Sequence, residues 1–245
     1  MSEIVTAGIL VIGDEILSGR TKDKNIGFIA EYLTNIGIDL REVRVVSDDE
    51  ADIIAALNAL RQRYTYVFTT GGIGPTHDDI TADSVAKAFG VGIDHHPDVV
   101  ARFKERFKDD LNEARLRMAR IPDGAELVQS ATILAPGFMI GNVIVMAGVP
   151  SIMQAMMDIV APKLKSGVKM LSDSVRANAR EGDIGSPLRD IQKAHPATSI
   201  GSYPFLDEDS KPNTNIVVRS RDADKLAAAM ADVQAMLAGL KVVRP

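Results

Sequence analysis

The sequence of 245 residues contains no cysteine, which excludes a disulfide framework and any metal site built from thiolates. It has no hydrophobic run near the length of about 18 residues that a membrane-spanning helix requires. Its first residues lack the basic segment that precedes the apolar core of a secretory signal peptide. We therefore expect a cytoplasmic protein that has no association with a membrane.

Positive charge is not in excess either, since 28 basic residues face 33 acidic ones and the formal net charge is −5. This balance argues against nucleic acid as a partner, because nucleic-acid binding relies on basic surfaces. The four histidines have no spacing typical of a metal site. No Ser/His/Asp or Cys/His arrangement is evident, so nucleophilic catalysis has no support in the sequence.

Short apolar segments alternate with segments of helical periodicity over most of the chain. Strands are predicted at 4–12, 38–46 and 64–69, and helices at 23–35, 49–61 and 80–89. This alternation predicts an α/β fold with a mostly parallel sheet and helices on both of its faces.

The rest of the chain is predicted less regularly. One long charged helix is expected over 97–121, two strands over 134–149 joined by a turn at 137–142, and a further helix over 151–164. After Gly167 the pattern changes to a β-α-β-β-α order, which suits a small α+β module. We therefore expect two domains, residues 1–167 and residues 168–245.

Glycine-rich loops follow the first and third predicted strands, at the edge of a parallel sheet where ligands bind. The first, GDEILSG, spans Gly13–Gly19, and the second, TGGIGPTHDD, spans Thr70–Asp79. A dinucleotide fingerprint would need glycine at His77, and a P-loop would need lysine at Asp14, so neither motif is present. Backbone N–H groups of such loops bind anions; the alternative is a tight strand-to-helix turn.

Acidic residues follow all three of these strands, so they are expected to meet at one edge of the sheet. They are the pairs Asp14 and Glu15, Asp48 and Asp49, and Asp78 and Asp79. Carboxylates beside a phosphate repel it unless a divalent cation such as Mg²⁺ lies between them. We therefore predict a divalent metal held by Asp79, Asp48 and Asp14. The alternatives are an N-cap for one aspartate of a pair and a solvated loop acid for Glu15.

Six motifs occur in an order that resembles the molybdenum-cofactor biosynthesis (MoaB/Mog-like, molybdopterin-binding) domain family. They are GDEILSG, KDKN, VVSDD, TTGGIGPTHDDIT, APGF and AGVPS. Within that family the chain is similar to the N-terminal domain of CinA and to the molybdopterin-binding-like domain of FAD synthases. The resemblance covers residues 4–165, and the tail with EGDIGSPL and SIGSYPF is similar to the module that follows in those proteins.

The resemblance implies a three-layer α/β/α fold, a site at the strand ends and self-association into a homo-oligomer. In Mog-type proteins two aspartates that match Asp48 and Asp79 serve metal-dependent chemistry on molybdopterin, which implies catalytic roles for both here. Asp23 matches a residue of another family loop. The predicted ligand-binding residues are Gly13, Asp14, Glu15, Gly19, Asn25, Thr70, Gly71, Gly72, Gly74, Pro75, Thr76, Asp78, Thr81, Gly148 and Pro150.

Two departures favour the CinA and FAD synthase branch. Ile73 stands where Mog-type proteins carry threonine, and Ala147 replaces a proline of the family's Pro-Gly-x-Pro motif. The resemblance thus implies a metal-dependent pyrophosphatase that acts on ADP-ribose, FAD or a similar phosphate-containing small molecule. The alternatives are a molybdopterin-binding protein of cofactor biosynthesis and a non-catalytic nucleotide-binding module. Because the chain ends at Pro245, we expect neither CinA deamidase nor FAD adenylyltransferase activity.

Overall fold

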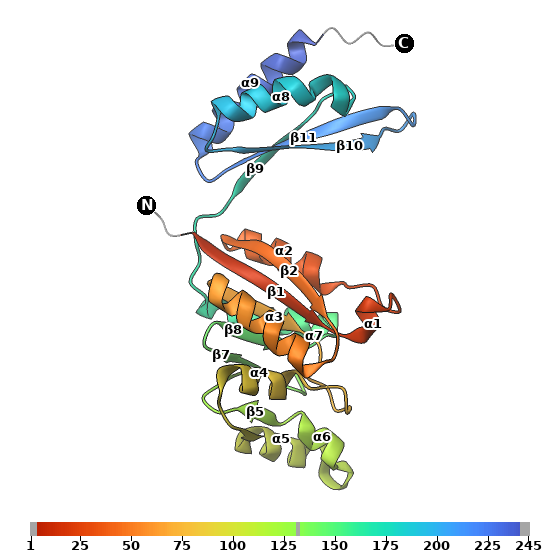
Figure 1. Ribbon diagram of the computed structural model, residues 1–245, viewed down its shortest axis with the longest axis vertical. Coiled ribbons are helices and arrows are strands. Elements are labelled where there is room, and N and C mark those ends of the chain that lie inside the picture. Colours follow the sequence, from red (N-terminus) through yellow and green to blue (C-terminus); the bar gives the residue numbers. More distant parts are fainter. Residues whose placement is uncertain (1–3, 131–132, 241–245) are drawn as a thin grey trace. The chain divides into compact units, whose positions relative to one another are not determined.

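The computed structural model describes residues 4–130 and 133–240. The chain divides after Gly167 into two compact units (Figure 1). Each unit has a hydrophobic core of its own. None of the helices in the described ranges has the length and hydrophobicity needed to span a bilayer.

The first unit is built on a six-stranded sheet with the strand order β2-β1-β3-β8-β7-β6. The first four strands in this order run parallel, and β7 and β6 continue the sheet with antiparallel pairing. This arrangement confirms the mostly parallel sheet predicted from the sequence. The bounds are β1 (Val5–Ile12), β2 (Ile38–Val46), β3 (Tyr66–Thr70), β6 (Glu126–Val128), β7 (Gly137–Ile140) and β8 (Val143–Met146). The turn predicted at 137–142 is wrong in extent, because residues 137–140 form β7 and only Gly141 and Asn142 join it to β8.

Alternate side chains of β1 enter separate cores on the two faces of the sheet, as the two-residue period of a strand requires. Ile9 and Val11 pack in the core that holds α2 (Asn25–Asn35) and α7 (Pro150–Val160). Leu10 and Ile12 pack in the core that holds α3 (Glu50–Arg63) and α4 (Thr81–Phe89). Helices therefore cover both faces, which confirms the three-layer fold (Figure 1).

The parallel strands also end at one edge of the sheet. Ile12 of β1 lies opposite Val46 of β2, and Val11 lies opposite Thr70 of β3, which in turn lies opposite Met146 of β8. The loops that follow these four strands therefore start side by side, and the first of them leads into the short helix α1 (Asp14–Leu17).

The single long helix predicted over 97–121 is wrong. This segment contains α5 (Pro97–Phe107), the 3-10 turn η1 (Lys108–Asp110), α6 (Glu113–Arg117) and β5 (Arg120–Pro122), which pairs with β4 (Ile93–His95). Lys108 has φ 47°, a left-handed conformation that ends α5. The side chain of Asn112 then accepts the N–H of Arg115 and starts a new helix.

The second unit has the β-α-β-β-α order that the sequence predicted. Its elements are β9 (Leu171–Arg176), α8 (Glu181–Ala194), β10 (Ser199–Leu206), β11 (Pro212–Ser220) and α9 (Ala223–Gly239). The three strands form an antiparallel sheet in the order β10-β11-β9. Ile216 and Val218 of the central strand share a core with Ile184 of α8 and Val233 of α9. The 3-10 turn η2 (Ala161–Lys163) follows α7 at the end of the first unit.

Candidate functional site

A pocket opens between the end of β1, the turn before α2 and the loop that follows β3. It has a volume of about 240 Å³, and we call it the β1–α2 pocket. Apolar side chains of Val11, Ile12 and Ile16 form part of its wall. The predicted ligand residues that line it are Glu15, Asn25, Thr70, Gly71, Gly148 and Pro150.

Two buried polar side chains on this wall have unpaired oxygen atoms. Asn25 is 5% exposed and Thr70 is 1% exposed. The Asn25 Nδ2 donates to the carbonyl oxygen of Gly148 at 2.8 Å, which fixes the amide, but its Oδ1 has no partner. The Thr70 Oγ1 has no partner either. Both oxygens are shielded from solvent, so they lie beneath the pocket wall and not on its open surface. A buried unpaired polar atom lowers stability, so these two positions are strained points of the wall.

The loop between β3 and α4 depends on glycine for its path. Gly71 has φ 101°, and a Cβ atom there would lie 2.1 Å from the carbonyl oxygen of Ile12. Gly72 has φ 66° and lies against Thr81. The Thr81 Oγ1 donates to the Gly71 carbonyl at 2.9 Å and the Thr81 N–H to the Gly72 carbonyl at 3.0 Å. Thr81, a predicted ligand residue, therefore anchors the loop from α4.

Asp79 orders the same loop from within. Its Oδ2 accepts from the N–H of Thr76 at 2.8 Å and from the Thr76 hydroxyl at 2.5 Å, and it lies against Gly74. Helix α4 begins after Ile80 and has no side-chain cap. The alternative in which Asp78 or Asp79 caps this helix is therefore wrong.

The two aspartates after β2 have separate roles. Asp49 caps α3, because its carboxylate accepts from the N–H groups of Ala51 at 2.9 Å and Asp52 at 3.1 Å. The Asp48 Oδ2 instead accepts from the Asp14 N–H at 2.9 Å, which joins the ends of β1 and β2. The N-cap alternative is thus confirmed for Asp49, and Asp48 does not cap α3.

Negative charge gathers around Asp48. Burial raises the pKa of the Asp48 carboxyl, and the charges of Asp14, Glu15 and Asp78 raise it further, against the hydrogen bond from the Asp14 N–H. The Asp48 carboxylate therefore lies within electrostatic reach of acidic residues from the loops after β1 and β3. Asp78 rather than Asp79 is the member of the β3–α4 loop whose charge acts on Asp48.

In residues 4–130 and 133–240, no three or more His, Asp or Glu side chains are arranged as a metal site. The predicted ligands Asp14, Asp48 and Asp79 thus do not form a closed site in this conformation. Mg²⁺ commonly keeps several waters and takes one or two carboxylates together with phosphate oxygens. Asp14 and Asp48, which the Asp14 N–H joins by a hydrogen bond, are the residues that would hold a cation bound in that way.

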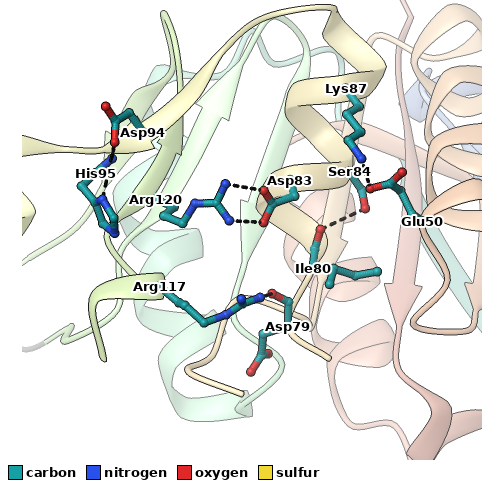
Figure 2. Close-up of polar contacts among 10 residues, drawn as sticks. All are labelled: Glu50, Asp79, Ile80, Asp83, Ser84, Lys87, Asp94, His95, Arg117 and Arg120. Carbon is teal, nitrogen blue, oxygen red and sulfur yellow. Dashed lines mark hydrogen bonds and ion pairs between the residues drawn. The ribbon is translucent and has the colours of Figure 1, made fainter. Parts of the chain in front are cut away.

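The β3–α4 loop also borders a second pocket, toward α4 and β5, which has a volume of about 20 Å³. We call it the Arg117 pocket. Arg120 forms a two-pronged ion pair with Asp83 in it, at 2.8 Å and 2.6 Å. The Arg117 Nη2 donates to the Asp79 carbonyl at 3.3 Å, and the buried Arg117 Nε has no protein partner. Figure 2 shows the Asp79 carboxylate pointing away from Arg117.

The predicted site residues are thus distributed over several places. Gly72, Gly74 and Asp79 line the Arg117 pocket. The predicted residues that line neither pocket are Gly13, Asp14, Gly19, Asp48, Pro75, Thr76, Asp78 and Thr81.

Five charged residues that line the pockets were missed from the sequence, and one of them is Asp83 of α4. Lys22 and Lys24 line the β1–α2 pocket, and both belong to the motif KDKN that carried part of the resemblance. Arg117 and Arg120 line the other pocket and fell inside the wrongly predicted long helix. The position of the lysines in a family motif was an available signal, and the arginines had none.

Two family models match the chain. Residues 8–166 match the model described as "Probable molybdopterin binding domain". Residues 169–245 match the model described as "FAD synthase, middle domain". The boundary between the two matches lies close to Gly167, where the structure divides into its two units.

Individual relatives extend over the same regions. A protein of Aeropyrum pernix is 32% identical in an alignment of 244 positions that covers 95% of this chain and 91% of that protein. The "Probable FAD synthase" of Caenorhabditis elegans is 29% identical over 98% of this chain, but the match spans 51% of that relative. The crystal structure of CinA from Thermoplasma acidophilum is 33% identical with a TM-score of 0.62, covering 65% of this chain and 98% of that one. The chain therefore belongs to the MoaB/Mog-like molybdopterin-binding domain family, in a form that also carries the FAD synthase middle domain.

Proposed function

We propose that the protein hydrolyses the pyrophosphate bond of a dinucleotide such as ADP-ribose or FAD with the help of a divalent metal. The observation that carries the proposal is the β1–α2 pocket, which opens where β1 ends, beside the glycine-rich loop after β3. Its wall includes Glu15, one of the carboxylates that act on Asp48. A ligand ring in this pocket would bring attached phosphates close to those carboxylates.

The acidic cluster supplies the chemistry in this proposal. Asp14 and Asp48 would hold a divalent cation, which would neutralise charge at the phosphates and make a nearby water more acidic. The Asp14 N–H donates to the Asp48 carboxylate and keeps it in place. A water oxygen would attack one phosphorus and lose its proton to bulk water, and the bond to the bridging oxygen would break to give two phosphate monoesters. Asp79 acts by ordering the β3–α4 loop.

The test is incubation with ADP-ribose or FAD in Mg²⁺ or Mn²⁺, followed by chromatographic detection of AMP. We expect Asp48→Asn to lower the rate at least about 100-fold, because an amide binds the cation more weakly than a carboxylate does. Asp98→Asn, which removes a carboxylate from the first turn of α5, is the matched control and should keep the rate of the unchanged protein. Absence of AMP above the level of Asp48→Asn would end the proposal.

A second candidate function is molybdopterin binding, which the match of residues 8–166 to a molybdopterin-binding domain model favours. The β1–α2 pocket would then hold the pterin. Fluorescence titration with molybdopterin tests it, and Thr70→Val should weaken the binding because it removes the unpaired hydroxyl. A protein that binds a nucleotide but releases no AMP with any metal would instead be a non-catalytic module.

A further inference from the structure

Two lysines on the wall of the β1–α2 pocket carry charges that the protein does not neutralise. Lys22 and Lys24 both line the pocket and are exposed. Within the described ranges neither forms an ion pair, whereas Lys87 pairs with Glu50 at 2.5 Å. Neither lysine charge is therefore neutralised by a carboxylate of the described residues.

The carboxylate between these lysines serves another purpose. The Asp23 Oδ1 accepts from the N–H of Asn25 at 3.0 Å and from the N–H of Ile26 at 2.8 Å. These are the first N–H groups of α2, where a negative charge is stabilised by the helix dipole. Asp23 therefore caps α2, and its hydrogen bonds hold the turn that places both lysines on the pocket wall.

The interior of the pocket indicates which part of a ligand enters it. Val11, Ile12 and Ile16 give it an apolar wall, the unpaired Asn25 Oδ1 and Thr70 Oγ1 lie beneath that wall, and Glu15 and Thr21 add polar groups to the lining. An apolar wall with a few placed polar atoms suits a heteroaromatic ring. A charged group attached to that ring would stay at the mouth, since burying an unpaired charge is strongly unfavourable.

We propose that Lys22 and Lys24 bind the phosphates of a nucleoside diphosphate whose ring occupies the β1–α2 pocket, and that they set the preference for it over the nucleoside. This inference rests on the proposed function and deepens it. In this arrangement the phosphates have a different neighbour on each side. Glu15 and the carboxylates near Asp48 contact the phosphates through a cation, and the two lysines contact the phosphate oxygens directly.

Isothermal titration calorimetry in Mg²⁺ tests the inference with two probes, adenosine and the non-hydrolysable methylene analogue of ADP. We expect the unchanged protein to bind the diphosphate analogue more tightly than adenosine. The double variant Lys22→Gln/Lys24→Gln should bind the analogue roughly 10-fold more weakly, through loss of charge-assisted hydrogen bonds, and bind adenosine unchanged. Added salt should weaken analogue binding less in this variant.

Lys104→Gln is the matched control, because Lys104 is an exposed lysine of α5 and lines neither pocket. It should leave both affinities unchanged. Unchanged analogue binding by the double variant overturns the inference. So does an equal loss for both probes, which would mean that the lysines only support the pocket, or failure of the unchanged protein to bind the analogue. If analogue binding needs the lysines but ADP-ribose gives no AMP, the pyrophosphatase proposal alone fails.

Discussion

The two pockets that border the β3–α4 loop differ in how their polar groups are satisfied. In the β1–α2 pocket, Asn25 and Thr70 keep unpaired oxygens beside about 240 Å³ of space. In the Arg117 pocket, Arg120 is paired with Asp83 and the free space of about 20 Å³ admits about one water molecule. We call the first the ligand side of the loop, because we propose that it binds the ligand, and the second the framework side, because the Arg120–Asp83 ion pair fixes it. The framework side also has one buried unpaired atom, the Arg117 Nε.

The position where the loop leaves β3 should tolerate change least. Gly71→Ala would put a Cβ atom 2.1 Å from the Ile12 carbonyl at a φ of 101°, so the loop and the end of β1 must move apart. We expect a loss of about 3 kcal/mol or more in the free energy of unfolding, measured by urea titration, and loss of nucleotide binding.

Gly19→Ala provides the matched comparison for Gly71→Ala. Gly19 has φ 72°, but a Cβ atom there would meet nothing within 4 Å. We expect it to lose only about 1 kcal/mol, from backbone strain alone. Equal losses for the two variants would mean that the close approach of Gly71 to β1 does not constrain the loop.

Substitutions on the framework side should lower the free energy of unfolding without lowering the affinity for the ligand. Asp83→Asn would leave Arg120 without its carboxylate in a partly exposed setting, so we expect a loss of about 1–2 kcal/mol in the free energy of unfolding. Arg117→Met should lose less than about 1 kcal/mol, since it removes one long hydrogen bond and an unpaired N–H. Calorimetry should give unchanged nucleotide affinity for both. A marked drop in affinity for Arg117→Met alone would turn the Arg117 pocket into a ligand site.

The ligand side was more accessible from the sequence than the framework side. Glycine and carboxylate residues that follow predicted strands must meet at one edge of a parallel sheet, so Asp14, Asp48 and Gly71 could be placed together before any coordinates existed. The assignment of roles could not be made, because Asp48 and Asp49 are adjacent and only their hydrogen bonds distinguish the site residue from the cap.

The framework side could not be predicted because it depends on a break in a helical pattern. Charged residues continue from α5 into α6, so periodicity alone favours one helix. The left-handed Lys108 and the Asn112 cap turn the chain and bring Arg117 to the loop. The role of Asp79 could not be predicted either. Its carboxylate accepts a hydrogen bond from Thr76 within a local turn, and the sequence does not show which of the adjacent aspartates does so.

Substitutions at the adjacent threonines at the end of β3 would distinguish an effect on ligand binding from an effect on stability. Thr69 and Thr70 are both buried with unpaired hydroxyls, but only Thr70 lines the β1–α2 pocket. Either substitution to valine should raise the free energy of unfolding by about 1 kcal/mol, since each removes a buried unpaired group. Only Thr70→Val should weaken nucleotide binding, roughly 10-fold by calorimetry. Equal affinities for the two variants would place the ligand elsewhere.

The smallest expected effect concerns the charge of Asp48. Burial raises the pKa of this carboxyl in the folded state, so its contribution to stability is present below the unfolded pKa of about 3.9 and is lost as pH rises through the folded value. Asp48→Asn keeps an acceptor for the Asp14 N–H and removes the charge. In EDTA at pH 7 we expect it to raise the free energy of unfolding by less than about 1 kcal/mol, and the gain should disappear near pH 3.

Magnesium should make the unchanged protein more stable than Asp48→Asn, because a cation at the carboxylates stabilises the charged form and binds only the folded chain. Urea midpoints should rise with Mg²⁺ for the unchanged protein and stay constant for Asp48→Asn. Asp49→Asn is the neighbouring control: it also removes one charge, but asparagine still caps α3, so its response to Mg²⁺ should match that of the unchanged protein. If Mg²⁺ shifts the midpoint of Asp48→Asn by as much as the others, the cation does not bind at Asp48, and the ligand side of the loop functions without it.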